Sequence, residues 1–575
     1  MRDDTVSVVV GGEAGQGISR SGMLLGKALM RCGFHCYGAV DYPSLIRGGH
    51  NFYQLRASAR PVYSQTPHVD VLVALNKESV TLHLGEMNAG GGVIHDERDK
   101  LEEGLGKDAG IKFYPVPLTD IVKELGGPDI MRNTVALGAV AALIGLDAEA
   151  LKQVVAETFE GRENIIKMNN DAVQKGHDHV AERGYEFGCC LEPGERPGRL
   201  WLTGNDAVAL GAMAAGCKFY SAYPMTPASP LLHYFAGHDK AEDAAVIQTE
   251  SEIAAAMMAI GASYAGVRSM TGTSGGGFSL MAESLSLAAM AETPLVIMLG
   301  QRPGPSTGLA TYSAQGDLLF AVYGAHGEFQ RIVVAPGDAE ECFYLAAEAF
   351  NLAERFQVPV IILTDKTIVE SNQTVDMFDL SKVRIDRGKL VDRWGGPGEY
   401  WRYRDEDDGV STRALPGTEG VLVPANSNEH LENGLSTSRS GDAVRMVDKR
   451  FRKAGHIREA VEGLQPIRVY GDERPWVTLL GWGSTKGPAL EALKLLKAES
   501  IKARFVQVVF MEPFPGDLER YLKGTCVLIE GNRSAQLGTL IRLNTGYSFK
   551  HVGLRYDGRP LDPGEIVDRV MEAIA

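Results

Sequence analysis

Residues 218–227 read KFYSAYPMTP, residues 244–260 read AAVIQTESEIAAAMMAI, and residues 267–277 read VRSMTGTSGGG. In each stretch a short apolar run ends at Pro, Gly, Ser or Thr, and helical patterns separate the runs. Apolar runs that alternate with helices of about 12 to 20 residues are typical of parallel sheets. These stretches therefore predict an α/β unit, which we place at residues 200–379.

The same alternation extends to both sides of this unit and predicts several doubly wound parallel-sheet domains. Expected strands of the middle unit are 218–222, 246–248, 267–271, 295–299, 332–334 and 358–363. A first unit, 1–185, has expected strands 6–10, 52–55, 69–75, 93–95 and 111–116 and helices 18–32 and 134–146. A third α/β unit occupies 467–575, with a strand beginning at Trp476.

Two stretches lack this alternation. Residues 176–199 are rich in charge, Gly and Pro and are interpreted as a linker. Residues 380–466 gain Arg, Asp, Gly and Asn, and we interpret them as a long excursion that packs on, or links, the neighbouring units.

Composition narrows the class of protein. With 44% hydrophobic and 23% charged residues, the 575-residue chain is typical of globular proteins. Its net charge of −15 argues against nucleic-acid binding, and its longest apolar run is far shorter than the roughly 20 residues that cross a bilayer. The start MRDDTVSVVV has no basic or cleavable leader pattern, so we expect a cytoplasmic protein.

The seven cysteines carry no metal-binding pattern. They are Cys32, Cys36, Cys189, Cys190, Cys217, Cys342 and Cys526. No pair has the CxxC spacing that zinc or iron–sulfur sites use, so we expect buried thiols and no cluster in this chain.

Glycines mark the first loop, VVVGGEAGQGISRSG, between an expected strand and an expected helix. Backbone amides at a helix start can hold a phosphate where glycine lets the ligand approach. The loop contains Gly12, Gly15 and Gly17, but its spacing fits neither a dinucleotide fingerprint nor a Walker loop. A phosphate-bearing ligand and a plain tight turn both remain open, and CoA is a weak candidate.

Residues 41–56, DYPSLIRGGHNFYQLR, place Arg47 before two glycines. An arginine on such a loop can present its guanidinium to a carboxylate or phosphate. A solvated arginine explains the local sequence equally well, and His50 is expected to be structural.

The middle unit has the densest set of candidate residues. Two prolines flank Met225 and Thr226 and restrict the backbone there, so the Thr226 hydroxyl is held in place. Glu250 and Glu252 stand at the start of a helix, where a carboxylate often only compensates the helix dipole. Arg302 is the fixed positive charge among the loops TGTSGGG and GQRPGPSTGLAT. Such loops at one sheet edge predict a site for an anionic ligand.

In order, YPMTPAS, QTESEIAAAMMAIGAS, TGTSGGGFSLMAESL and PLVIMLGQRPGPSTGLAT resemble the α subunit of the 2-oxoacid:ferredoxin oxidoreductases, nearest to the 2-oxoglutarate branch. Residues 1–185, with GGEAGQG and YPSLIRGGHN, are similar to the family's γ domain, here fused before α. Residues 467–575 resemble its transketolase C-terminal-like domain. The resemblance covers nearly the whole chain and is loose over 380–466.

This resemblance implies that residues 200–379 form the pyrimidine-binding domain for thiamine diphosphate. It aligns the family's glutamate with Glu252, not Glu250, as the group that hydrogen-bonds the aminopyrimidine ring. It also places Tyr223, Pro224 and Thr226 at the cofactor. Thr226, Arg302 and Thr311 would contact the 2-oxoacid, and Arg47 would reach the distal carboxylate of 2-oxoglutarate.

Two patterns of the family are missing from this chain: a GDG…N motif for Mg²⁺ and diphosphate, and a CxxC set for a cluster. In the family both belong to a separate β subunit. The resemblance thus implies an (αβ)₂ assembly in which β supplies the metal, the iron–sulfur cluster and the path to ferredoxin, while CoA accepts the acyl group as succinyl-CoA. The isolated chain is expected to be inactive.

Other functions remain open from the sequence. Within the family, the substrate could be pyruvate, a branched-chain 2-oxoacid or a broad range of them. From another class, the first glycine loop alone fits a non-catalytic subunit that binds CoA or a nucleotide. A transketolase-like enzyme without electron transfer would need its own GDG motif, which the sequence lacks.

Overall fold

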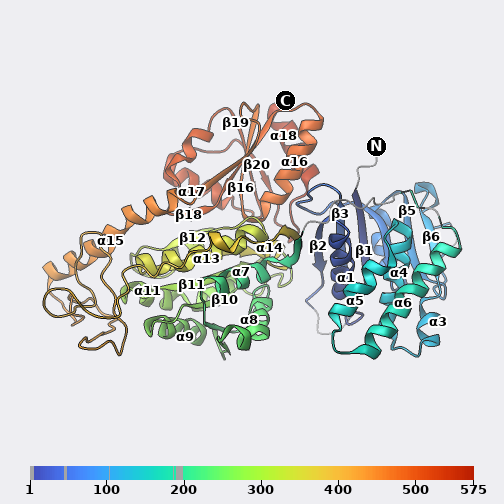
Figure 1. Ribbon diagram of the computed structural model, residues 1–575. Helices are drawn as coiled ribbons and strands as arrows, with labels where there is room; N and C mark the ends of the chain where they lie inside the picture. The colour runs from blue at the N-terminus through green and yellow to red at the C-terminus, as the bar shows by residue number, and fades with distance from the viewer. Residues whose placement is uncertain (1–4, 45–47, 103, 186, 189–197) are drawn as a thin grey trace. The chain divides into compact units, whose positions relative to one another are not determined.

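The computed structural model describes residues 5–44, 48–102, 104–185, 187–188 and 198–575. These residues form three sheets flanked by helices (Figure 1), and the expected α/β class with mainly parallel sheets is confirmed. By internal contacts the chain divides into two compact units. The first comprises Met1–Leu202 with Glu370–Met377, and the second comprises Thr203–Val369 with Phe378–Ala575.

Among the described residues, the first unit has an eight-stranded sheet in the order β6-β5-β4-β1-β3-β2-β14-β7. Its strands are β1 (Thr5–Glu13), β2 (His35–Asp41), β3 (His50–Ser58), β4 (Val69–Ala74), β5 (Met87–Asp96), β6 (Lys112–Val116), β7 (Arg199–Thr203) and β14 (Asn372–Asp376). β1, β4, β5 and β6 run parallel, whereas β3, β2 and β14 continue the sheet in antiparallel pairs. Residue 200, where we expected the middle unit to begin, therefore lies in a strand of the first sheet.

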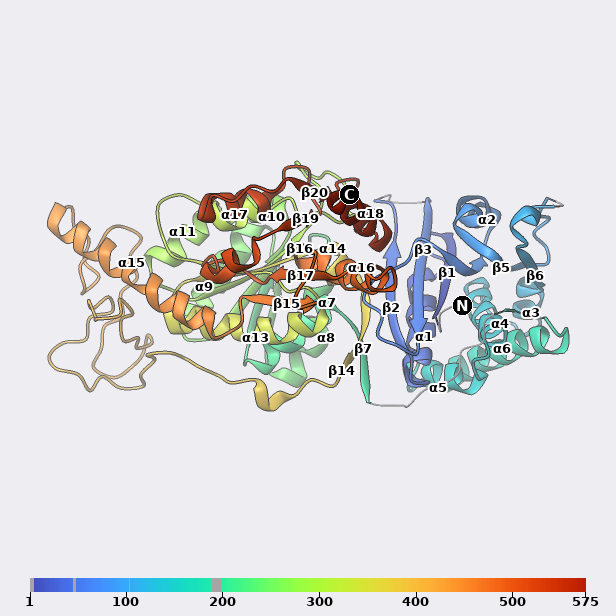
Figure 2. The same ribbon diagram turned by 90° about the horizontal axis from the view of Figure 1, so that it is seen from above.

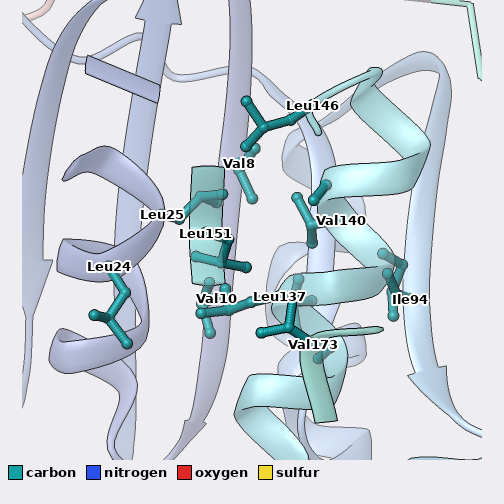
Figure 3. Packing of buried hydrophobic residues seen from close by; sticks show 14 of the residues in the cluster. Val8, Val10, Leu24, Leu25, Ile94, Leu137, Val140, Leu146, Leu151 and Val173 are labelled. Atoms are coloured by element: carbon teal, nitrogen blue, oxygen red, sulfur yellow. The ribbon is translucent and has the colours of Figure 1, made fainter. Parts of the chain in front are cut away.

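Six helices accompany this sheet in the described residues: α1 (Ile18–Arg31), α2 (Lys77–His83), α3 (Leu118–Glu124), α4 (Arg132–Ile144), α5 (Ala148–Thr158) and α6 (Glu163–Glu182). Figure 3 shows Val8 and Val10 of β1 packed with Leu25 of α1, Leu137 of α4 and Val173 of α6. Each such buried aliphatic side chain contributes about 1.5–3 kcal/mol of hydrophobic stabilisation. The core of this unit thus joins the central strand to three helices.

The prediction of a linker at 176–199 is partly wrong. Helix α6 continues to Glu182, so the first seven residues of that stretch are helical. Gly176 packs directly on α4, because a Cβ atom there would lie 1.9 Å from the carbonyl oxygen of Val135. This glycine permits a close helix contact and does not end the helix.

The second unit contains a seven-stranded sheet in the order β18-β12-β13-β11-β10-β8-β9, counted over the described residues. Its strands are β8 (Phe219–Ala222), β9 (Ala245–Gln248), β10 (Ser269–Thr273), β11 (Leu295–Gln301), β12 (Ile332–Val334), β13 (Pro359–Asp365) and β18 (Phe510–Glu512). All pairs but β12 with β18 are parallel. All six strands expected for the middle unit are confirmed.

Helices separate these strands as expected. They are α7 (Gly204–Ala214), α8 (Ser229–Glu242), α9 (Glu252–Tyr264), α10 (Gly275–Leu280), α11 (Ala282–Met290), α12 (Leu318–Tyr323), α13 (Ala339–Phe356) and α14 (Lys366–Glu370). The buried faces of α9 and α10 share a core with β11 and β13. The start of each of these two helices is thereby fixed against the sheet.

The C-terminal part adds a third sheet, in the order β15-β17-β16-β19-β20. It consists of β15 (Ile467–Gly471), β16 (Val477–Trp482), β17 (Ala503–Val508), β19 (Thr525–Glu530) and β20 (His551–Leu554), with helices α16 (Lys486–Ala498), α17 (Gln536–Thr545) and α18 (Pro563–Ile574). Trp482 and Leu528 of this part lie in one core cluster with Leu299 and Phe278 of the middle part. The two sheets of the second unit thus share buried side chains.

Residues 380–466 are irregular up to a 23-residue helix, α15 (Ser440–Glu462), which the sequence analysis missed. Figure 2 shows this helix, in orange, beside the irregular segment that precedes it. Lys449 and Lys453 of α15 are buried and both pair with the carboxylate of Glu292, which lies before β11. These ion pairs attach the excursion to the unit.

Within the residues that the structure describes, no helix is both long enough and apolar enough to cross a membrane.

Candidate functional site

Four loops of the second unit meet at one edge of its sheet. Strands β9, β8, β10 and β11 are neighbours and run parallel, so their carboxyl ends lie at the same edge. The loops after β8 and β11 carry Thr226 and Arg302, Glu252 begins α9 after β9, and Gly275–Gly277 form the first turn of α10 after β10, called the glycine turn below. Open parallel sheets bind ligands at the carboxyl ends of their strands. This edge is therefore the candidate site.

Glu252 is the first residue of α9, and its side chain is buried. The residue is only 4% exposed, and its Oε1 atom has no hydrogen-bond partner among the described residues. Burying a carboxyl oxygen without a hydrogen-bond partner is costly, so such an atom indicates a place for a ligand that hydrogen-bonds the carboxyl group. Glu250, in contrast, is exposed and accepts a hydrogen bond from the Ser251 hydroxyl.

The turn Gly275–Gly277 lies against this carboxylate. A Cβ atom at Gly277 would lie 2.6 Å from Glu252 Oε1 and 2.1 Å from Thr273 Oγ1. The hydroxyl of Ser274 is also buried without a partner in the described structure. A flat ring that offers both donors and acceptors fits this combination of close backbone and unsatisfied oxygens. The residues therefore suit the aminopyrimidine half of thiamine diphosphate.

Thr226 and Arg302 lie close together although they are far apart in the chain. The Arg302 guanidinium donates a hydrogen bond of 2.9 Å from Nη1 to the backbone carbonyl of Thr226. Burial lowers the pKa of Arg302, and the nearby carboxylate of Asp317 partly offsets this effect. One nitrogen of the guanidinium is thus engaged by the protein, and the rest of the fork can bind an anion.

The other expected site residues of this unit differ in exposure. Tyr223 is 39% exposed, Pro224 is half-buried, and Thr311 is 5% exposed. Tyr223 and Pro224 lie in the loop after β8, as Thr226 does, while Thr311 lies in the loop after β11, as Arg302 does. A direct hydrogen bond joins Arg302 of the second loop to the Thr226 backbone of the first.

Asp317 is a site residue that the sequence analysis missed. A Cβ atom at Gly275 would lie 2.4 Å from Asp317 Oδ2, so this carboxyl packs on the same glycine turn as Glu252. Its Oδ2 atom is buried and has no hydrogen-bond partner among the described residues. Burial raises the pKa of Asp317 to about 6, and the charge of Arg302 opposes this shift. Nothing in the stretch SAQGDLLF indicates that its acid is buried.

The C-terminal part holds the loop that connects Arg302 with Asp317. Gln315 Nε2 donates to the carbonyl of Trp482 at 2.9 Å, and Gln315 Oε1 accepts from the N–H of Gly531 at 2.7 Å. Asn532 Nδ2 donates to the Gln315 carbonyl at 2.9 Å. Residues 530–538, EGNRSAQLG, thus anchor this loop.

The glycine loop of the first unit begins later than the sequence suggested, because β1 continues to Glu13. Gln16 closes the loop: its Oε1 accepts from the Glu13 N–H and would lie 2.4 Å from a Cβ at Gly12. Gly15 and Gly17 have φ of 90° and 76°, and no side chain caps α1 at Gly17. A tight turn is confirmed, and a bound phosphate or CoA stays a prediction.

Arg47 lies outside the described residues. His50 follows it in β3, and His50 Nε2 is 2.8 Å from Nε2 of His83, whose Nδ1 hydrogen-bonds Glu86 at 2.6 Å. Burial and the charge of His83 lower the pKa of His50. His50 therefore has hydrogen-bonding partners within the first unit.

Two family models match the chain. Residues 210–449 match "Pyruvate flavodoxin/ferredoxin oxidoreductase, thiamine diP-bdg", and residues 7–179 match "Pyruvate ferredoxin/flavodoxin oxidoreductase". The first match contains Thr226, Glu252, Arg302 and Asp317, and the second contains the glycine loop of the first unit.

Known proteins are similar to part or all of this chain. The α subunit of 2-oxoacid:ferredoxin oxidoreductase 2 of Aeropyrum pernix is 35% identical, over 99% of this chain and 98% of the relative. The 2-oxoglutarate synthase subunit KorA of Methanothermobacter thermautotrophicus is 31% identical over 65% of this chain and 98% of its own length. The solved 2-oxoglutarate:ferredoxin oxidoreductase of Magnetococcus marinus matches with a TM-score of 0.91 and 33% identity, over 100% of both chains.

Proposed function

The chain belongs to the family of 2-oxoacid:ferredoxin oxidoreductase α subunits, and we propose that its substrate is 2-oxoglutarate. The complete enzyme would convert 2-oxoglutarate and CoA to succinyl-CoA and CO₂, or run the reverse carboxylation. The relatives named for 2-oxoglutarate support this substrate, as does the Magnetococcus marinus structure, which has 2-oxoglutarate, coenzyme A and succinyl-CoA bound. The unpartnered Glu252 carboxylate at the glycine turn carries the catalytic part of the proposal.

The proposal gives each part of the chain a role. Residues 1–185 correspond to the γ domain, residues 200–379 to the pyrimidine-binding domain and residues 467–575 to the transketolase C-terminal-like domain. Residues 380–466 connect the last two. The family match over 210–449 supports the pyrimidine-binding role.

When bound, thiamine diphosphate supplies the carbanion chemistry that releases CO₂ from a 2-oxoacid. Glu252 holds a proton at Oε1 in a hydrogen bond to the aminopyrimidine ring, and burial of this carboxyl keeps water from competing. Tyr223, Pro224 and Thr226 line the cofactor. Thr226 and Thr311 offer hydroxyls to the substrate, and Arg302 binds its carboxylate and oxo oxygens with the nitrogens that Thr226 leaves available.

We further propose that a β subunit completes the site. It would supply the diphosphate site with Mg²⁺ and an iron–sulfur cluster that passes electrons to ferredoxin, in an (αβ)₂ assembly. Arg47 would contact the distal carboxylate of 2-oxoglutarate, and Gly12, Gly15 and Gly17 are weak candidates for contact with CoA. The chain alone would be inactive.

Two alternatives are separated by activity. Relatives named simply 2-oxoacid:ferredoxin oxidoreductase favour a broad-range enzyme, one of the family alternatives beside a pyruvate or branched-chain enzyme. A non-catalytic subunit that binds CoA or a nucleotide is the alternative of another class. It would lose no turnover on Glu252→Gln, because it has none.

The test is steady-state kinetics of the complex of this chain with its β subunit, with viologen dye as electron acceptor. We expect CoA-dependent dye reduction with the highest kcat/KM for 2-oxoglutarate, compared with pyruvate and 2-oxoisovalerate. Similar kcat/KM values for the three acids would replace the proposed substrate by the broad-range alternative. No CoA-dependent reduction with any 2-oxoacid would contradict the proposed function.

A further inference from the structure

A second carboxyl group, half-buried, lies at the glycine turn, and the proposed catalysis does not use it. Asp317 lies against Gly275, two residues before the glycine that Glu252 contacts. Its Oδ2 atom is buried and has no partner in the described part of the chain. Burial without a donor is unfavourable for the ionised form of a carboxyl, so such a group gains from protonation or from a ligand that hydrogen-bonds it.

The position of Asp317 is fixed from both sides. Its backbone N–H donates to Gln301 Oε1 at 2.9 Å, and its carbonyl accepts the first hydrogen bond of α12 from Ala321 at 2.8 Å. Gln536 of the C-terminal part holds the adjacent residues, because its Nε2 donates to the Gly316 carbonyl at 2.6 Å and its Oε1 accepts from the Leu319 N–H at 3.0 Å. These contacts hold the backbone of Asp317 beside Gly275.

The charged groups around this carboxyl come from two loops. Arg302, after β11, attracts its ionised form, and Glu252, at the start of α9, lies at the other glycine of the same turn. The turn itself and the preceding Gln315 and Gly316 are uncharged. Burial outweighs the attraction by Arg302 and raises the pKa of Asp317 to about 6, so the free protein carries it mostly ionised at neutral pH.

We propose that Asp317 takes up a proton when an anionic 2-oxoacid binds at Arg302, and that the protonated carboxyl then donates a hydrogen bond to an oxygen of the bound acid. This inference rests on the proposed function, since it requires Arg302 to bind the substrate carboxylate. In the proton balance of binding, ionised Asp317, one proton from the solvent and one 2-oxoacid anion give a complex in which Asp317 is neutral. Asp317 then determines how binding depends on pH.

Changes in the charge near Asp317 explain why it would take up a proton when the substrate binds. A substrate carboxylate at Arg302 offsets the positive charge that favours ionised Asp317 and brings another negative charge near this carboxyl. Both effects favour the protonated carboxyl. Between the pKa values of Asp317 in the free protein and in the complex, affinity for the acid should therefore fall by up to about tenfold per pH unit as the pH rises.

Calorimetry measures this proton directly, without turnover. The complex of this chain with its β subunit and thiamine diphosphate is titrated with N-oxalylglycine, an unreactive isostere of 2-oxoglutarate, and with oxamate, the corresponding mimic of pyruvate. Titrations at pH 7.5 in buffers of different ionisation enthalpy give the number of protons taken up on binding. The variants are Asp317→Asn and, as a control that removes an exposed carboxylate elsewhere, Glu328→Gln.

We expect uptake approaching one proton for the wild type and for Glu328→Gln. Asp317→Asn should lose that uptake but still bind the mimic, because its side-chain N–H donates a hydrogen bond without first taking up a proton. No uptake in the wild type, or equal uptake in Asp317→Asn, would overturn the inference and leave the proposed function intact. If the wild type bound neither mimic, the 2-oxoacid site itself would be contradicted, and this inference with it.

A second variant keeps the test decisive if Asp317→Asn does not fold. Gly275→Ala leaves the carboxyl in the chain but would place a Cβ atom 2.4 Å from its Oδ2, so the carboxyl must move. We expect this variant to take up less than half of the wild-type proton. Full uptake in a folded Gly275→Ala protein would show that the proton goes elsewhere.

Discussion

Arg302 Nη1 lies 2.9 Å from the backbone carbonyl oxygen of Thr226, so the loops after β11 and β8 are joined directly at the candidate site. Gly300 allows the two loops to pack closely, because a Cβ atom there would lie 3.0 Å from Cγ of Pro227. The arginine is therefore held before a ligand arrives. Such preorganisation lets the guanidinium bind an anion with little loss of side-chain entropy.

Gly277 is expected to be essential for the site. Gly277→Ala places a Cβ atom 2.6 Å from Glu252 Oε1 and must displace that carboxylate. We predict a loss of dye-reduction activity of at least about tenfold, since small displacements of catalytic groups are costly.

Gly276 offers the matched control for this substitution. A Cβ atom at Gly276 has no heavy atom within 4 Å, although it lies in the same turn. Gly276→Ala should therefore keep most of the activity. Equal losses in the two variants would show that the turn is sensitive to any side chain and that the Glu252 contact is not the cause.

Arg47 is predicted to select substrate length. In Arg47→Ala, kcat/KM for 2-oxoglutarate should fall by about 10- to 100-fold, the scale of one lost charge-assisted contact, while kcat/KM for pyruvate changes little. Kinetics of both acids on one preparation give their ratio directly. Equal losses for the two acids would remove Arg47 from binding of the distal carboxylate.

Gln315 is predicted to act on the site through the loop that it anchors. Gln315→Ala removes the hydrogen bonds to Trp482 and Gly531 and leaves the Gly531 N–H without an acceptor, a loss of about 1–3 kcal/mol. The KM for the 2-oxoacid should rise several-fold with a smaller change in kcat. Gln153→Ala, which shortens an exposed glutamine elsewhere in the chain, is the control variant. An unchanged KM in a folded Gln315→Ala protein would separate this anchor from substrate binding.

The ion cluster of Glu292 with Lys449 and Lys453 is predicted to hold α15 in place. Glu292→Gln removes the carboxylate from two buried ammonium groups. Breaking a buried pair costs about 3–5 kcal/mol, so the unfolding midpoint in denaturant should fall clearly.

The exposed pair of Glu572 with Arg569 is the reference for that measurement. Glu572→Gln should change stability by less than about 1 kcal/mol, because solvent screens such pairs. If Glu292→Gln were equally mild, the buried cluster would not be what attaches the excursion.

The sequence predicted the central parallel strands well, because β11 and β13 are short runs of mostly apolar residues. β11 was expected at 295–299 and spans Leu295–Gln301, and β13 was expected at 358–363 and spans Pro359–Asp365. It also indicated which loops meet, since neighbouring parallel strands end at one edge. Glu252, Thr226 and Arg302 were identified from these loops together with the family resemblance.

The features that the sequence analysis missed depend on burial or on long-range contacts, which the residue types alone do not indicate. Gly176 was interpreted as part of a linker, yet its missing side chain lets α6 approach Val135. Helix α15 buries Lys449 and Lys453, and its charged sequence was interpreted only as part of the long excursion 380–466. β7 and β14 join the first sheet from segments far along the chain, which no local pattern predicts. Asp317 was missed because its carboxyl became notable only when its surroundings were known.

The central claim is that Glu252 at the glycine turn serves thiamine-dependent oxidation of a 2-oxoacid. The most direct measurement is CoA-dependent viologen reduction with 2-oxoglutarate by the complex with β, for wild type, Glu252→Gln and Glu250→Gln, with cofactor content determined for each. We predict a loss of several orders of magnitude in kcat for Glu252→Gln at full cofactor occupancy, since a catalytic acid–base group contributes about 10²–10⁴-fold or more, and near-wild-type turnover for the exposed Glu250→Gln. A Glu252→Gln enzyme that turns over at the wild-type rate would contradict the account.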